Sequence, residues 1–309
     1  MATTDELDDD HPETYGVLPL FAPTAETETT FSLPAAELLG ERPYLYTFDT
    51  PASIRMLRSV EGGGGTLFGH CITSSADGQT PGAATVGSVG VAARLLEAGS
   101  EAFGGRVVTV DVVSTYRFVV VDLVSSFPFV TARVAPLSDE TAIGAEAEAE
   151  VEALEAEVEA ELGSLARLGA LLLSGASLSE EAAAALEAPA LLLRRHAQQK
   201  AEGTYAEAAA RVQTSEAALR RQSLSLAACE LVQLPPQVAA AALATTSGAA
   251  RLRLLLAQLR PIVAEMAALQ ALGALGDPRV AGEGLVSGVP GQPWKLRAAE
   301  AEAEAAEGA

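Results

Sequence analysis

The stretch at residues 106–137, RVVTVDVVSTYRFVVVDLVSSFPFVTARVAPL, decides the fold of the first half of the chain. At its start, Val108, Val110 and Val112 alternate with polar residues. Successive side chains of a β-strand point to opposite faces, so this alternation predicts a strand with one buried face.

Two more strands are predicted in the same stretch. FVTARVAPL repeats the alternation, with Val130, Ala132 and Val134 on one side. Between the two alternating segments, YRFVVVDLV has too little alternation for a solvated face and predicts a strand covered on both sides. The residues Ser126 to Pro128 suit a turn between neighbouring strands. Short apolar runs bounded by turn residues make the whole region from 15 to 137 β-rich.

One helix is expected inside this region, from Thr50 to Val60. Thr50 suits the N-cap, and Pro51 suits the first helical position, where no amide donor is needed. Ile54, Met56 and Leu57 are available for packing.

After Ser138 the sequence changes to a helical pattern. Apolar residues recur at intervals of three and four, which predicts an amphipathic helix whose stripe is Val151, Leu154, Val158, Leu162 and Leu165. Glutamates cover its other faces, and we expect a solvated surface there, with an acidic docking surface as the alternative. Further helices are predicted at residues 179–201, 204–234, 235–244 and 247–272, the last capped by Ser247 or Thr246 and ended by Gly273.

These patterns divide the chain into four parts. We expect a disordered acidic N-terminus at residues 1–14, a β-rich domain at 15–137, a helical bundle at 138–273, and a Gly/Pro-rich and Ala/Glu-rich tail at 274–309.

Composition excludes several classes of function. The chain carries 41 acidic against 20 basic residues, a net charge of −21, which argues against a partner whose phosphates need Lys and Arg. The N-terminus has neither a basic nor an apolar segment and so resembles no secretory signal. The apolar stretch 252–275 is interrupted by Arg253, Arg260 and Glu265, so a membrane span is not expected. The sequence predicts a soluble intracellular protein in a reducing compartment, without a nucleic-acid partner and without a membrane span.

No catalytic, cofactor or metal site is predicted. Cys71 and Cys229 are interpreted as two buried thiols in a reducing compartment, although one disulfide is possible in principle. His70 and Cys71 are neighbours on a predicted strand and point to opposite faces, so they cannot share a metal or form a base–nucleophile pair. A buried Cys beside a half-exposed His is expected instead. The glycines of EGGGGTLFGH lack the Lys of a phosphate-binding loop.

The order of several motifs resembles the substrate-binding N-terminal domain of the ATP-dependent Lon proteases. The β region runs through VLPLF, LYTFDTPASIRML, LFGHCI, VGSVGVAARLLE, VVTVDVVSTYRFVVVDLV and FVTARVAPLSDE. SLSLAACELVQLPPQVAAAALATTSGAARLRLLLAQL, residues 223–259, is similar to that family's helical bundle. The family's FEPRY is FDTPA here, and its glycine near the Arg-Phe pair is replaced by Ser114 or Thr115. No counterpart of the ATPase or protease modules is present, so the chain resembles a stand-alone Lon N-terminal domain protein.

This resemblance implies an α+β fold, in which a PUA-like β pseudo-barrel precedes an all-α helical bundle and an extended C-terminal tail. It also implies binding of exposed apolar polypeptide, for which surplus aromatic residues are the candidates: Phe21, Phe31, Tyr44, Tyr46, Phe48 and Phe68. The alternative is that these residues fill a small core. Arg117 and Phe118 match the family's Arg-Phe pair and are expected to be structural. Such proteins occur in bacteria and in plastid-bearing organisms, so we expect the plastid stroma in a plant or alga and the cytoplasm otherwise.

Two functions follow from these observations. The first is a non-catalytic polypeptide-binding protein, an adaptor or holdase. The second is a structural or assembly subunit of a larger complex, docked through its β domain and its tail. The tail contains the chain's one tryptophan, Trp294, in a segment spaced by Pro290 and Pro293. An aromatic anchor of this kind docks into a pocket on another chain or folds back onto its own bundle.

Overall fold

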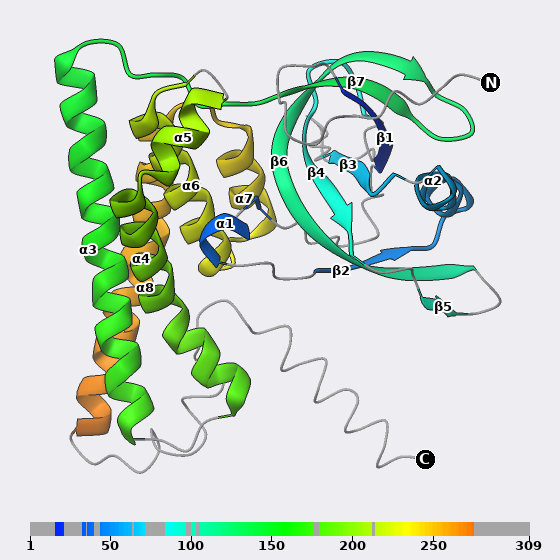
Figure 1. Ribbon diagram of the computed structural model, residues 1–309. Helices are drawn as coiled ribbons and strands as arrows, with labels where there is room; N and C mark the ends of the chain where they lie inside the picture. Colours follow the sequence, from blue (N-terminus) through cyan, green and yellow to red (C-terminus); the bar gives the residue numbers. More distant parts are fainter. Residues whose placement is uncertain are drawn as a thin grey trace, which may run out of the picture.

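The protein was analysed as a computed structural model that describes residues 16–21, 33–34, 36–39, 44–63, 65–71, 84–96, 100–102, 106–175, 179–211 and 214–274. All strands lie before residue 137 and all long helices after residue 144. The strands and helix α2 form a β lobe, and the other helices form a helical lobe beside it (Figure 1). The expected α+β class, with a β region followed by a helical bundle, is confirmed.

The β lobe contains one sheet that closes on itself. Its strands are β1 (Gly16–Phe21), β2 (Tyr44–Phe48), β3 (Leu67–Cys71), β4 (Val89–Leu95), β5 (Ser100–Ala102), β6 (Val107–Ser125) and β7 (Thr131–Pro136). The strand order is β2-β6-β4-β3-β1-β7, and β6 also pairs with β7, which closes a barrel of five strands. All pairings are antiparallel except that between β1 and β3.

The long strand β6 unites two strands that the sequence predicts separately. The backbone stays extended through Ser114 and Thr115, and the pairing with β4 shifts between Ala92 and Ala93. Thr115 is the unpaired extra residue, and its hydroxyl donates to the carbonyl oxygen of Ala92 at 3.0 Å. A bulge of this kind bends the strand without ending it, so one strand serves both halves of the barrel.

Alternation along the strands follows the prediction at both ends of the quoted stretch. Val108, Val110 and Val112 are buried, as are Ala132 and Val134 in β7. The middle segment differs from the prediction, because only its first half is covered and residues 121–124 are exposed. The last pairing of β6 with β4 is at Val119, so the end of β6 extends beyond the strand that covers it.

Helix α2 (Pro51–Gly62) forms where the sequence predicts it. The hydroxyl of Thr50 accepts a hydrogen bond from the amide of Ser53, while the Ser53 hydroxyl accepts one from the Thr50 amide. This reciprocal capping box satisfies two amides that the first turn leaves without helical partners. Met56 and Leu57 are fully buried against the β lobe.

The helical lobe consists of α1 (Ala36–Leu39), α3 (Ala145–Gly175), α4 (Glu180–Glu202), α5 (Thr204–Arg211), α6 (Glu216–Leu231), α7 (Pro236–Ala244) and α8 (Gly248–Ala274). The prediction of a single helix at residues 204–234 is wrong, since two helices, α5 and α6, occupy this range. Ser215 starts the second helix by accepting a hydrogen bond from the Ala218 amide, and such a cap competes with continued helix. Helix α8 ends one residue after Gly273, and Ser247 caps its start.

Helices α3 and α8 lie side by side and run in the same direction (Figure 1). Glu150 pairs with Arg253, and Glu157 pairs with Arg260, so both pairs have the same sequence offset. A constant offset means that the two helices keep one register over two turns. The predicted apolar stripe of α3 lies in the core of this lobe. Among the described residues, no helix has the length and apolar character needed to span a membrane.

The N-terminal third of the chain contributes to both lobes. Leu33, Leu38 and Leu39 lie in the helical core, although they precede most of the β-strands. Glu230 of α6 accepts a hydrogen bond from the Leu33 amide at 2.8 Å, which fixes this segment to the helical lobe. The helical lobe therefore includes a segment from before residue 137, in addition to the helices that follow it.

Candidate functional site

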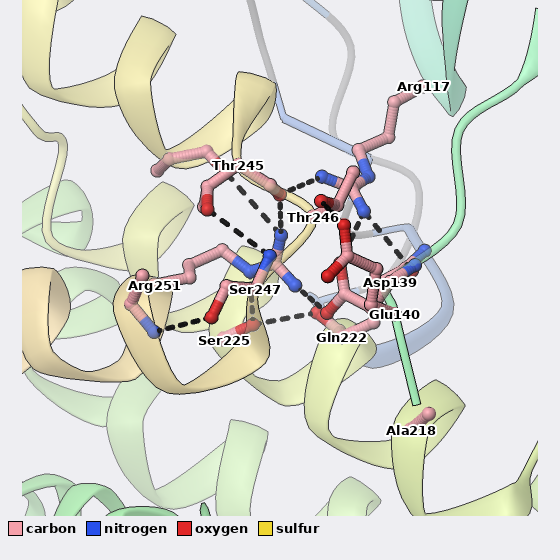
Figure 2. Close-up of polar contacts among 12 residues, drawn as sticks. Arg117, Asp139, Glu140, Ala218, Gln222, Ser225, Thr245, Thr246, Ser247 and Arg251 are labelled. Carbon is pink, nitrogen blue, oxygen red and sulfur yellow. Dashed lines mark hydrogen bonds and ion pairs between the residues drawn. The ribbon is translucent and has the colours of Figure 1, made fainter. Parts of the chain in front are cut away.

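The two lobes are joined by a buried cluster of charged side chains (Figure 2). Arg117 of β6 and Arg251 of α8 are both almost completely buried, and both pair with Asp139 in the connection between β7 and α3. Arg117 also donates from Nη1 to the carbonyl oxygens of Leu243, at 2.8 Å, and Thr245, at 2.7 Å. These carbonyls lie at the C-terminal end of α7, where the helix dipole favours a cation.

Polar side chains of α6 complete this cluster. Gln222 Oε1 accepts a hydrogen bond from the Asp139 amide at 3.0 Å, and the Ser225 hydroxyl accepts one from Arg251 Nε at 2.7 Å. Burial, together with the neighbouring Arg251, lowers the pKa of Arg117 to about 10, so the guanidinium stays charged at neutral pH. The cluster therefore holds the lobes together and offers no reactive group.

Phe118 follows Arg117 and lies inside the barrel, fully buried. Two glycines make room for its ring: a Cβ atom would lie 2.7 Å from Phe118 Cζ at Gly69 and 2.5 Å from it at Gly90. The burial of both members of the Arg-Phe pair agrees with the structural role expected for them.

Most of the aromatic residues predicted to bind polypeptide form the core of the β lobe. Tyr46, Phe48 and Phe68 are at most 1% exposed, Phe21 is buried, and Tyr44 is half-buried against the same cluster. Their rings contact one another edge to face, with a centroid separation of 4.8 Å for Phe21 and Phe48 and of 5.7 Å for Phe48 and Phe68. A contacting role for these four buried residues is therefore corrected to a packing role, because they pack together with Met56 and Leu57 of α2 and the valines of β6 in one buried cluster.

The other predicted site residues lie outside the described part of the chain. They are Phe31, Pro290, Pro293 and Trp294, and their roles stay predictions.

His70 is buried, whereas the sequence predicts a half-exposed histidine. Strand β3 is part of the barrel wall and both of its faces are covered, one by the cluster that contains Cys71 and the other by the cluster that contains Phe68, so neither face reaches solvent. The His70 ring packs against Tyr46 and Phe21, and its Nδ1 lies 2.9 Å from the Tyr46 hydroxyl oxygen. Burial lowers the pKa of His70 to about 3, so the imidazole is neutral at physiological pH.

Cys71 packs in the cluster on the opposite face of β3, as the alternation predicts. Cys71 and Cys229 are both buried and free, which confirms the interpretation as two buried thiols rather than a disulfide. Burial raises the pKa of each thiol to about 12. Neither thiol is a nucleophile at neutral pH, since the reactive form is the thiolate.

Among the described residues, the largest run of exposed apolar side chains lies on the hairpin that joins β6 to β7. We call it the hairpin patch: Val121 (38% exposed), Leu123 (41%), Val124 (54%) and Phe127 (82%). The sequence did not reveal it, because an unbroken apolar run is also typical of a buried strand. In Figure 1 this hairpin projects from the β lobe on the side away from the helical lobe.

The backbone of β6 is also available beside the hairpin patch. Beyond Val120, β6 pairs with β7 on one side, and no strand in the described ranges pairs with it on the other. Two register shifts interrupt the pairing with β7, after Val120 and after Leu123. Bulges and the charge of Asp122 discourage unlimited pairing along an edge, while a short extended peptide can still align there.

Neither a family model nor a curated protein matches this chain. Solved structures that are similar to it include the following two. The N-terminal domain of the Mycobacterium avium complex Lon protease has 15% identity and a TM-score of 0.41, over 79% of this chain and 98% of that one. The Lon N-terminal domain protein from Xanthomonas campestris has 17% identity and a TM-score of 0.38, over 78% and 98% respectively.

Proposed function

We propose that this protein is a non-catalytic polypeptide-binding protein, an adaptor or holdase that captures exposed apolar segments through the hairpin patch. The observation that carries the proposal is the exposure of Phe127, 82%, in a β lobe whose other described phenylalanines are buried or half-buried. A large aromatic side chain in solvent has no role in folding stability, whereas aromatic side chains are common anchors of protein interfaces.

The surroundings of the patch support this role. Apolar side chains of Val121, Leu123 and Val124 lie next to a strand edge. A bound segment in extended conformation would gain main-chain hydrogen bonds from the edge and apolar contacts from the side chains. The buried charged cluster around Asp139 anchors the middle of β6 through Arg117, a few residues before the patch, so the patch is presented on a rigid strand.

The test compares the affinity of two variants for an unfolded polypeptide. A fluorescently labelled, reduced and carboxymethylated protein serves as the probe, and fluorescence anisotropy measures its binding. Phe127→Ser combined with Val124→Ser should weaken binding about tenfold or more, since each lost aromatic or aliphatic anchor costs on the order of 1–2 kcal/mol.

The matched control is Ile143→Ser. Ile143 is 93% exposed, lies in the connection before α3 and is not part of the hairpin. This variant should bind like the wild type. Equal affinity of the hairpin variant and the wild type would remove the patch from the proposal, and absence of binding by the wild type would remove the function itself.

The same patch favours a second candidate, in which it is a permanent interface of an assembly subunit. A fixed partner would co-purify in stoichiometric amount and would be lost in the Phe127→Ser, Val124→Ser variant. Deleting residues 282–309 tests the contribution of the tail: this candidate predicts a weaker complex with an unchanged fold.

A further inference from the structure

The helical lobe contains a second group of functional side chains, far from the hairpin patch in sequence. Glu155 and Glu159 of α3 face His196 of α4, and one possible ligand atom from each lies within 4.8 Å of the other two. The two glutamates are four residues apart, so they lie on the same face of α3. Imidazole nitrogen and carboxylate oxygen are ligands that Zn²⁺ accepts in proteins.

His196 is held in the orientation of a metal ligand. Its side chain is 3% exposed, and its Nδ1 lies 2.9 Å from the hydroxyl oxygen of Tyr205 on α5. Within the described ranges its Nε2 atom makes no hydrogen bond, although Glu159 Oε1 lies 3.3 Å away. In metal sites the second ring nitrogen of a ligating histidine is typically fixed by such a hydrogen bond, which leaves the other nitrogen free to bind the ion.

Glu155 is fixed by two arginines of α6. Arg220 donates to both of its carboxylate oxygens, at 2.7 and 2.8 Å, and Arg221 donates to Oε2 at 3.0 Å. A carboxylate has about four acceptor sites, and these three bonds leave one on Oε1. The arginines therefore position Glu155 and keep it ionised without using its last acceptor site.

The charge balance of the cluster admits a divalent cation. The carboxylates of Glu148, Glu155 and Glu159 oppose the guanidinium groups of Arg220 and Arg221, three negative charges against two positive ones. The hydrogen bond from Arg221 lowers the pKa of Glu148, and the nearby His196 lowers the pKa of Glu159. Because the Glu159 side chain is partly exposed, an ion can reach the buried Glu155 and His196 from solvent past Glu159.

We propose that Glu155, Glu159 and His196 form a zinc-binding site that fastens α3 to α4, with water as a fourth ligand. Ligand atoms around a tetrahedral zinc lie about 3.3 Å apart, which is the observed separation of His196 Nε2 and Glu159 Oε1. The site is independent of polypeptide binding by the hairpin patch. Its role is to stabilise the helical lobe, because a ligand that binds only the folded state raises the free energy of unfolding.

Calorimetric titration of the untagged full-length protein with ZnCl₂ tests the site. We expect saturable binding of one zinc ion per chain and an increase in the thermal midpoint on adding zinc. Glu159→Gln should weaken zinc binding at least tenfold and abolish the zinc-dependent increase. This side chain is partly exposed, so the variant should fold.

The matched control is Glu157→Gln. Glu157 lies on the same helix and pairs with Arg260 instead of facing His196. It should bind zinc like the wild type. A second variant, Tyr205→Phe, removes the hydrogen bond to His196 Nδ1 and should weaken zinc binding about 10–100-fold. Absence of one-to-one binding by the wild type, or equal affinity of the Glu159→Gln and wild-type proteins, would overturn the proposal.

Discussion

Arg117 and Arg251 bind the two oxygens of a single carboxylate, that of Asp139, although one arginine belongs to the β lobe and the other to the helical lobe. Two buried cations thus share one buried anion. The carbonyl oxygens at the end of α7 accept further hydrogen bonds from both guanidinium groups. The orientation of the lobes therefore depends on this carboxylate.

Asp139→Asn should destabilise the protein strongly. Removing one partner of a buried ion pair costs about 3–5 kcal/mol, because the other charge stays buried without compensation. Here two guanidinium groups lose their shared carboxylate, so we expect the upper part of this range. Equilibrium unfolding in urea, followed by circular dichroism, measures the change.

The neighbouring Glu140 provides the control. It is exposed and its carboxylate accepts a hydrogen bond from the Thr246 hydroxyl, so Glu140→Gln should change the free energy of unfolding by less than about 1 kcal/mol. Equal effects of the two substitutions would contradict the role assigned to the buried cluster.

The close fit of Phe118 against two glycines leads to a second prediction. At Gly69 a Cβ atom would clash with side chains, at 2.6 Å from Leu20 Cδ2 and 2.7 Å from the Phe118 ring. At Gly90 it would also lie 2.6 Å from the carbonyl oxygen of His70, which is backbone. Alanine at either position should cost about 1–3 kcal/mol, and more at Gly90, since overpacking forces side chains or backbone to move.

Replacing the Phe118 ring by a smaller side chain distinguishes the clash at Gly69 from the clash at Gly90. Phe118→Leu should recover part of the stability lost in Gly69→Ala, because side chains alone cause that clash. It should recover less in Gly90→Ala, because the backbone contact stays. Double-mutant cycles from urea unfolding give both coupling energies, and equal rescue at the two glycines would refute this explanation.

Local patterns predicted most elements of this fold. The alternation in RVVTVDVVS and FVTARVAPL, the cap at Thr50 and the apolar stripe of α3 each reflect a few neighbouring residues. What they did not predict depends on contacts between segments that are distant in the sequence. Barrel closure buries Cys71 on one face of β3. Packing of β2 and α2 against the other face buries His70 and places Tyr46, Phe48 and Phe68 in the core instead of on the surface.

The candidate sites were less accessible to sequence analysis than the fold. The hairpin patch belongs to an apolar run whose exposure depends on where β4 ends. The zinc-binding residues come from two helices and are about forty positions apart, so no short motif contains them. Only the packing of α3 against α4 brings these residues together, and it depends on the whole helical lobe.

The buried, neutral His70 predicts a dependence of stability on pH. Its pKa is lowered from 6.5 in the unfolded chain to about 3 in the fold. Between these values the unfolded state binds a proton that the folded state excludes, so the free energy of unfolding falls as the pH falls. From pH 6.5 downward, this single histidine should contribute a loss of up to about 1.4 kcal/mol per pH unit.

His70→Gln removes the titrating group and should flatten the pH dependence of unfolding between pH 6.5 and pH 5. This window lies above the range in which most carboxylates titrate, so their contribution is small there. The substitution lowers stability at every pH because it alters a buried contact with Tyr46, and the slope is therefore the informative quantity. Urea unfolding at intervals of half a pH unit measures it. An unchanged slope in His70→Gln would show that the imidazole is already protonated in the folded protein, or that solvent reaches it there.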